Sequence, residues 1–186
     1  MDAGDHERFL ESMEEFNARD PIGSLYEHSF QKHRLGSRTP KSEKLVDIVC
    51  YCLNPNHYHL ILEQVSDYGI IKFMQRLGTG YTNYFNKKHE RTGALFQGKY
   101  KAIHVDSNEY LLHLSAYINL NDKVHQLGSS TPKSSWEEYI EFREKNFCKK
   151  EIILDQFNSR DEYKKFAESS LVDMIERKKI EKLLLE

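Results

Sequence analysis

A chain of 186 residues with a formal net charge of −2 is long enough for one domain with a sizeable core. Its 39% of hydrophobic and 30% of charged residues are ordinary for a globular protein. No apolar run approaches the roughly 20 residues that a membrane span needs, and the N-terminus is acidic rather than signal-like. The three cysteines are an odd number, which argues against a disulfide framework. These features predict a cytoplasmic protein without a membrane partner.

The middle of the chain is basic although the whole is not. Residues 71–101 hold seven Lys or Arg and one acid, Glu90, so their local net charge is +6. Tyr and Phe residues are interleaved with these cations, as in grooves that bind single-stranded nucleic acid through phosphate contacts and base stacking. A solvated helix face beside core aromatics is the alternative. The candidate DNA-binding residues are Arg76, Lys87, Lys88, Arg91, Lys99, Tyr100 and Lys101.

Residues 1–128 are interpreted as one domain, and residues 129–186 as a C-terminal helical extension. Residues 5–17 have apolar side chains at helical spacing and predict an amphipathic helix. Residues 17–44 contain Pro and Gly without clear periodicity, so we expect a long loop or insertion there. In the extension, the last helix is expected over residues 171–186.

A β-hairpin is predicted in the most apolar part of the chain. Residues 45–53 are a nearly continuous run of apolar, β-forming side chains, which indicates a buried strand. The turn Asn54-Pro55-Asn56 follows, and residues 57–63 indicate an antiparallel return strand.

Side chains alternate between the two faces of the return strand. This alternation places His57 and His59 side by side on the same face as Ile61. The opposite face, expected to be the core face, holds Tyr58, Leu60 and Leu62. Two imidazoles on one strand face have the geometry of metal ligands, although a structural or solvent-facing pair is the alternative.

A long helix is expected after the hairpin. Asp67 can cap it, and the helix should reach about Lys88. Its apolar stripe is formed by Ile70, Ile71, Met74, Leu77, Tyr81 and Tyr84. Gly78 and Gly80 inside it each cost about 1 kcal/mol of helix propensity, so a close approach of another helix or backbone is expected there.

A strand over residues 99–105 and a helix over residues 108–120 follow. Asp106 or Ser107 is expected to cap this helix. Its core stripe consists of Leu111, Leu114 and Ile118. A neighbouring polar-aromatic stripe consists of Tyr110, His113, Tyr117 and Asn121.

Tyr117 and Asn121 lie four residues apart and are therefore expected on one face of the same helix. Two neutral imidazoles and an amide oxygen can hold a divalent cation that keeps open positions for substrate oxygens. A tyrosine hydroxyl beside such an ion can act as the nucleophile toward a phosphodiester. The free phenol titrates near pH ~10, and His113 and Lys101 are candidates for helping it ionise.

A structural zinc site is the rival interpretation of the hairpin. Cys50 and Cys52 share one strand face, and a tight hairpin could bring them near His57 and His59. The ligands of structural Cys₂His₂ sites are usually two to four residues apart, however. The spacing of both pairs is tighter than that, which disfavours zinc.

Four blocks in order resemble the HUH single-tyrosine transposases, and most closely the REP-associated tyrosine transposases. The blocks are Tyr51-Cys-Leu-Asn-Pro-Asn-His57-Tyr-His59-Leu, Gly93-Ala-Leu-Phe-Gln-Gly-Lys-Tyr-Lys-Ala102, Val105-Asp-Ser-Asn-Glu-Tyr-Leu-Leu112 and Ala116-Tyr117-Ile-Asn-Leu-Asn121. The resemblance extends from about Asp5 to beyond Tyr163, including Ser134-Ser-Trp136 and Tyr163-Lys-Lys-Phe166.

This resemblance implies a ferredoxin-like α/β sandwich with an antiparallel sheet, an α+β fold. It implies that His57, His59 and Asn121 bind Mg²⁺ or Mn²⁺. Tyr117 is implied as the nucleophile that forms a 5′-phosphotyrosine link and releases a 3′-hydroxyl. The implied substrate is single-stranded DNA with an adjacent hairpin, and the relatives include both monomers and homodimers. The alternative function is a non-catalytic, degenerate module that binds single-stranded nucleic acid.

Two departures from the family pattern bear on these expectations. Relatives usually open with a β-strand before the first helix, whereas this chain begins at that helix, so the opening strand is expected to be missing. Asn121-Asp122-Lys123 replaces the Asn-Pro-Val that is usual after the catalytic helix. The second departure removes none of the implied ligands.

Overall fold

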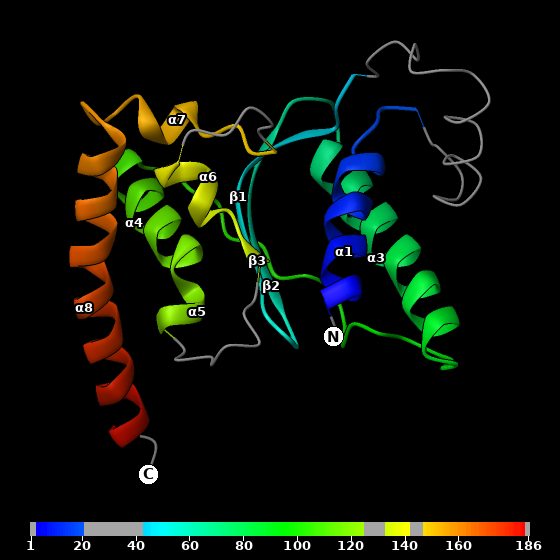
Figure 1. Cartoon of the computed structure of the whole chain (residues 1–186). Coiled ribbons are helices and arrows are strands. Elements are labelled where there is room, and N and C mark those ends of the chain that lie inside the picture. The colour runs from blue at the N-terminus through cyan, green and yellow to red at the C-terminus, as the bar shows by residue number, and fades with distance from the viewer. Residues whose placement is uncertain (1–2, 21–42, 125–132, 142–146, 185–186) are drawn as a thin grey trace. The chain divides into compact units, whose positions relative to one another are not determined.

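The computed structural model describes residues 3–20, 43–124, 133–141 and 147–184 (Figure 1). Packing divides the chain into two compact units, one formed by 1–47 with 63–102 and the other by 48–62 with 103–186. Helices and an antiparallel sheet are both present, so the predicted α+β class is confirmed. The division at residue 128 and the ferredoxin-like topology stay predictions.

In the first unit, the helices α1 (Ala3–Glu15) and α3 (Gly69–Lys88) pack side by side (Figure 1). Their contact is apolar, and the rings of Phe9 and Tyr81 meet edge-to-face at 4.7 Å between centroids. A Cβ added at Gly80 would lie 2.3 Å from the Phe16 ring, which explains one of the two predicted helix glycines. A Cβ at Gly78 would meet nothing within 4 Å, so no close approach explains that residue.

The start of α3 differs from the prediction. The N-cap is Tyr68, which has a φ of 58° and no side-chain cap, so the expected Asp67 cap is wrong. A Cβ at Gly69 would lie 2.0 Å from the carbonyl oxygen of Leu45, and this close approach fixes where the helix begins. In the apolar stripe, Met74, Leu77 and Tyr81 are buried as predicted, whereas Ile71 is 56% exposed. The residue that is buried in its stead is Phe73.

The sheet has the strand order β2-β1-β3. Its strands are β1 (Val46–Leu53), β2 (Tyr58–Gln64) and β3 (Lys133–Ser134). The predicted hairpin is confirmed, and the backbone N–H of Asn54 donates to the carbonyl of His57 at 2.9 Å to close its turn. The third strand pairs antiparallel to β1, with Cys52 opposite Ser134.

Among its described residues, the second unit also holds five helices. They are α4 (Asn108–Asn119), α5 (Asn121–Val124), α6 (Trp136–Ile140), α7 (Glu151–Leu154) and α8 (Arg160–Leu184). Ser107 caps α4 by accepting a hydrogen bond from the backbone N–H of Tyr110, as predicted. The long helix α8 lies along α4 (Figure 1). It runs without a break from residue 160, so the separate final helix predicted from residue 171 is wrong.

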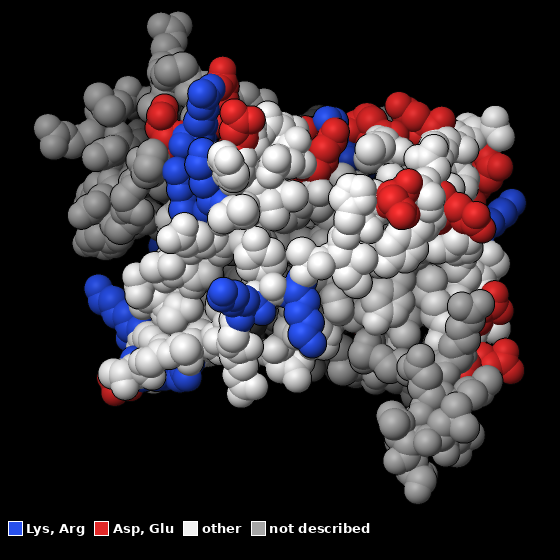
Figure 2. Space-filling view, turned by 180° about the vertical axis from the view of Figure 1, so that it is seen from behind, with Lys and Arg blue, Asp and Glu red and all other residues white. Residues whose placement is uncertain are grey.

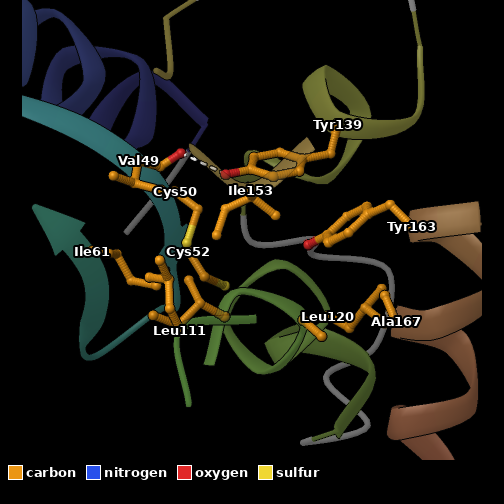
Figure 3. Close-up of a cluster of buried hydrophobic side chains, with 12 residues drawn as sticks. Val49, Cys50, Cys52, Ile61, Leu111, Leu120, Tyr139, Ile153, Tyr163 and Ala167 are labelled. Carbon is orange, nitrogen blue, oxygen red and sulfur yellow. Dashed lines mark hydrogen bonds between the residues drawn. The ribbon is translucent and has the colours of Figure 1, made fainter. Parts of the chain in front are cut away.

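A hydrophobic cluster joins the sheet of the second unit to α4 and α8 (Figure 3). Its buried residues are Val49, Cys50, Cys52, Ile61, Leu111, Ala116, Ile118, Leu120, Tyr139, Ile153, Tyr163 and Ala167. Ile61 belongs to this cluster, so the expectation that its face of β2 turns away from the core is wrong. The face of Tyr58, Leu60 and Leu62 is only partly buried.

Two further predictions need correction or lie outside the description. Residues 99–105, all of them described, form no strand, because no described edge of the sheet pairs with their backbone. Most of the loop expected over residues 17–44 lies outside the described residues. The described ends of this segment meet in an antiparallel bridge between Ala18 and Lys44.

Among the helices of the described residues, none is both long enough and apolar enough to span a bilayer.

Candidate metal and nucleophile site

The hairpin turn places the two histidines together. His57 is the last residue before β2, and His59 is the second residue of that strand. Their ring centroids are 5.0 Å apart with an interplanar angle of 85°. Both imidazoles therefore stand on one side of the hairpin, as the alternation of side chains predicts.

Asn54 connects His57 to Asn121 through one side-chain amide. Its Nδ2 lies 2.8 Å from Nε2 of His57 and donates to Oδ1 of Asn121, also at 2.8 Å. Asn54 is fully buried, and its Oδ1 lies 3.5 Å from the Sγ of Cys52. The amide thus joins two of the predicted ligands, which are 64 residues apart in the sequence, at the atoms that would bind a cation.

The hydrogen bonds of His57 define its tautomer. Nδ1 lies 2.7 Å from Oδ1 of Asn56, and an amide oxygen can only accept a hydrogen bond. The proton is therefore on Nδ1, and the lone pair of Nε2 accepts from Asn54. This is the neutral form that a metal ligand requires, with the second ring nitrogen oriented by a neighbouring oxygen.

Asn121 is placed differently from the prediction. The helix α4 ends at Asn119 with Leu120 as its C-cap, and Asn121 is the first residue of α5. The expectation that Tyr117 and Asn121 share one continuous helix is therefore wrong. Asn121 is fully buried, and among the described residues its Nδ2 has no hydrogen-bond partner. The orphaned group is an N–H donor, which can bind an acceptor but not a cation, whereas the amide oxygen of Asn121 accepts from Asn54.

Tyr117 lies beside the histidine pair. Its side chain is partly buried against the hydrophobic cluster, and its ring centroid is 6.0 Å from that of His59 at an interplanar angle of 68°. These residues are thus connected within the second unit by two ring contacts, of His59 with Tyr117 and of His59 with His57, and by the amide of Asn54, which joins His57 to Asn121.

The candidate ligands for a divalent cation are His57, His59 and Asn121. Nε2 of His57 and Oδ1 of Asn121 both contact the same Asn54 nitrogen, and His59 stands next to them. A cation bound by these two atoms would have to displace the Asn54 amide, and it would then have two imidazole nitrogens and one amide oxygen as ligands.

The rival zinc site is wrong. Among the described residues no group of three or more His, Cys, Asp or Glu side chains could hold a metal. Cys50 and Cys52 are fully buried within the hydrophobic cluster (Figure 3). Burial raises the pKa of Cys52 to about 12 and that of Cys50 further, so both side chains are neutral thiols.

The candidate DNA-binding residues all belong to the first unit. Two of them support the fold, because Arg76 donates to the carbonyl of Ala18 at 2.5 Å and Lys88 pairs with the buried Asp5 at 2.8 Å. The exposed candidates are Lys87, Arg91, Lys99, Tyr100 and Lys101. On the face shown in Figure 2, the Lys and Arg side chains form separate groups with uncharged surface between them. Their binding of DNA stays a prediction.

The two candidates for assisting Tyr117 are not placed beside it by any contact among the described residues. The ring of His113 packs against Phe166 of α8 at 5.1 Å, and Lys101 belongs to the first unit.

Asn54 and Asn56, by contrast, are site residues that sequence reasoning missed. They were interpreted only as turn formers, for which Asn is common, and their spacing from His57 was the signal that could have found them.

Comparison with known families places these residues in context. Residues 34–121 match a family model described as "Transposase IS200 like". The matched segment contains both histidines and Tyr117, and it ends at Asn121. Comparisons with curated proteins and with solved structures gave no match. Over residues 34–121 the chain is therefore similar to the IS200-like transposases, in agreement with the resemblance of its sequence to the single-tyrosine transposases.

Proposed function

We propose that this protein is a metal-dependent nuclease and strand transferase for single-stranded DNA. It would cleave next to a DNA hairpin through a covalent 5′-phosphotyrosine intermediate on Tyr117. The observation that carries the proposal is the contact of Tyr117 with His59, beside the His57–Asn54–Asn121 bridge. The family match supports the reaction class, since the relatives are transposases.

In the proposed site, His57, His59 and Asn121 hold Mg²⁺ or Mn²⁺. The bound ion would polarise the scissile phosphate and stabilise the charge that develops in the transition state. Asn56 keeps the proton of His57 on Nδ1, so the lone pair is on Nε2, and the ion would bind there in place of the Asn54 amide. Asn54 orients the ligand atoms of His57 and Asn121 toward one point.

Tyr117 supplies the nucleophile. Its phenolic oxygen attacks phosphorus, a new O–P bond forms and the P–O3′ bond breaks. The phenol proton is lost, and the departing O3′ takes up a proton to become the 3′-hydroxyl. Attack by that or another 3′-hydroxyl on the phosphotyrosine reverses the bonds and rejoins DNA, which is strand transfer.

The exposed basic residues of α3 and the segment that follows it would bind the DNA backbone. Lys99 and Lys101 flank the exposed ring of Tyr100, which is 44% accessible and able to stack on a base. Removing one cation that binds a phosphate should reduce the slope of log K against log salt by about 0.7 for single strands. Lys99→Ala is therefore expected to weaken binding and to make it less sensitive to salt.

Covalent adduct formation tests the proposed reaction. The protein is incubated with Mn²⁺ and a labelled single-stranded oligonucleotide that contains a hairpin, and the products are separated under denaturing conditions. We expect a shifted protein–DNA band in the wild type and none in Tyr117→Phe. Tyr110→Phe is the matched control, because Tyr110 lies on the same helix and has an exposed side chain.

Two results would contradict the proposal. If no oligonucleotide gives an adduct while salt-sensitive binding of single strands persists, the protein is a non-catalytic binding module. If the adduct persists in Tyr117→Phe and disappears in Tyr110→Phe, the nucleophile is assigned to the wrong tyrosine.

A further inference from the structure

A chain of hydrogen bonds runs along the face of α4 that carries Ser115 and Asn119, which is called the back of the helix below. The backbone N–H of Tyr51 donates to Oγ of Ser135 at 3.0 Å, and Ser135 donates to Oδ1 of Asn119 at 2.6 Å. Nδ2 of Asn119 then donates to the hydroxyl of Tyr163 at 2.9 Å. That hydroxyl lies 3.2 Å from Oγ of Ser115. Strand β1, helix α4 and helix α8 are joined by this one chain.

Ser115 donates its only hydroxyl hydrogen to the carbonyl of Leu112 at 2.7 Å, so it accepts from the hydroxyl of Tyr163, whose oxygen accepts from Asn119. The Ser135 hydroxyl also lies 3.3 Å from the carbonyl of Tyr51, as well as 2.6 Å from Oδ1 of Asn119. Both ends of the Asn119 amide are therefore paired. The side chains of Ser115, Asn119, Ser135 and Tyr163 are fully buried, which makes the loss of any of these bonds costly.

This chain lies on the side of α4 opposite Tyr117. Ser115 and Asn119 are four residues apart and share one face of the helix. Tyr117 lies midway between them in sequence and, at about 100° per residue, points to the other side. Bonds to two successive turns prevent α4 from rotating about its axis. The same chain ends on β1, which is hydrogen-bonded to the strand that carries His59.

We propose that Tyr163 is a positioning residue that holds Tyr117 at the histidine pair by fixing the back of α4. Tyr163 and Ser135 lie beyond residue 121, where the family match ends. The C-terminal part of the chain thus completes the site, although it contributes no group to the chemistry. This proposal rests on the proposed function only in assigning the reaction to Tyr117.

Tyr139 provides a matched control for Tyr163. Both tyrosines are fully buried, and their rings lie 5.1 Å apart in the same cluster (Figure 3). The hydroxyl of Tyr139 donates to the carbonyl of Val49 in β1 at 2.8 Å. Tyr139→Phe and Tyr163→Phe each remove one buried hydroxyl, but only Tyr163→Phe removes a bond to α4.

The test compares adduct formation in single-turnover experiments at saturating Mn²⁺ and oligonucleotide. We expect Tyr163→Phe to slow the reaction about 10-fold, because displacement of a reacting group by 1 Å can cost up to about 10²-fold. Tyr139→Phe should stay within about twofold of the wild type, because its bond does not reach α4. Mn²⁺ affinity, measured by the signal of free Mn²⁺ in electron paramagnetic resonance, should be unchanged in both variants. Amide hydrogen exchange in residues 111–121 should increase only in Tyr163→Phe.

Equal rates in Tyr163→Phe and Tyr139→Phe, or equal exchange in residues 111–121, would overturn the proposal. Ser115→Ala is a milder second variant that removes the acceptor of the Tyr163 hydroxyl together with the bond of Ser115 to the carbonyl of Leu112, and it introduces a good helix former. If Tyr163→Phe fails to fold, Ser115→Ala takes its place in the test. The reaction should then be slower in Ser115→Ala than in the wild type, and a wild-type rate would overturn the proposal. If the wild type forms no adduct, the proposed function fails, and the exchange of residues 111–121 still decides whether Tyr163 fixes α4.

Discussion

The two faces of α4 are held by different kinds of interaction. On the back, Ser115 and Asn119 take part in a buried chain of hydrogen bonds that includes Tyr163. On the front, Tyr117 meets His59 through a ring contact with centroids 6.0 Å apart. The back therefore fixes the helix with high angular precision, whereas the front leaves the tyrosine hydroxyl able to engage a substrate.

This difference separates scaffold from chemistry within one helix. Polar groups that are buried and fully paired give rigidity, because any rearrangement leaves donors or acceptors unsatisfied. Under the proposed function, Tyr117 would form and break a covalent bond to phosphorus, and its hydroxyl could not be bound in that way. Held in place by the rigid back of its helix, Tyr117 gains orientation without losing its hydroxyl to a permanent partner.

The largest expected effect comes from removing the front partner of Tyr117. His59→Ala should lower the rate of adduct formation by more than about 100-fold, because loss of a ligand exceeds the 10–100-fold cost of losing an outer partner. Thermal stability should change little, since His59 lies outside the buried cluster. His104→Ala is the control, an exposed histidine of the same unit. A rate within threefold of the wild type in His59→Ala would remove the histidine pair from the mechanism.

Breaking the back of α4 should instead lower stability. Asn119→Ala leaves the hydroxyls of Ser135 and Tyr163 without their amide partner in the core. We expect the free energy of unfolding to fall by about 2–3 kcal/mol, measured by denaturant titration. Asn158→Ala is the matched control, because Asn158 is at the surface and its hydrogen bonds to Glu162 are exposed, and it should cost less than about 1 kcal/mol. Equal losses in the two variants would mean that the chain contributes nothing beyond an ordinary surface bond.

The same contrast explains which parts of the site sequence could predict. The hairpin and the start of α4 depend on local signals: period-two alternation, an Asn-Pro-Asn turn, and the hydroxyl of Ser107. The end of α4 does not. The helix stops at Asn119, whose side chain is bound by Ser135 and Tyr163 from distant parts of the chain, so Asn121 falls in a new helix. No local pattern contains that information.

Errors of phase and pairing have the same origin. In α3, Ile71 is exposed and Phe73 is buried, while Met74, Leu77 and Tyr81 lie in the core as predicted. The β-forming residues 99–105 form no strand, although β2 is an edge strand of the described sheet. Asn54 was interpreted as a turn former, because its bond to Asn121 spans 67 residues of sequence. The structural preferences of these residues could be predicted from the sequence, whereas the distant residues that they contact could not.

A smaller effect is expected when Asn54, a residue of the site that contains Tyr117, is substituted. Asn54→Ala removes the donor that pairs with Nε2 of His57 and Oδ1 of Asn121. Without a cation, the free energy of unfolding should fall by about 1–2 kcal/mol. Saturating Mn²⁺ should raise the melting temperature of Asn54→Ala more than that of the wild type, because the ion then satisfies the two ligand atoms that Asn54 no longer pairs. An equal rise in both proteins would show that Asn54 does not face the bound ion.

The smallest effect concerns the phenols behind α4 in alkaline solution. Burial raises the pKa of Tyr163 and of Tyr139 above the usual value near 10, so the folded protein keeps both phenols neutral. The unfolded chain ionises first, and the stabilisation is fully present below pH about 10 and lost as pH rises through the folded pKa values. Buried thiols such as Cys148, whose pKa is also raised by burial, act in the same direction from about pH 8.5.

We expect the melting temperature to fall above pH 10, and to fall less steeply in Tyr163→Phe and Tyr139→Phe. Each substitution removes up to about 1.4 kcal/mol per pH unit from the slope of the free energy of unfolding against pH. Identical slopes in the wild type and both variants would mean that these phenols ionise in the folded protein as readily as in the unfolded chain, and the hydrogen-bond chain would then be open to water at high pH.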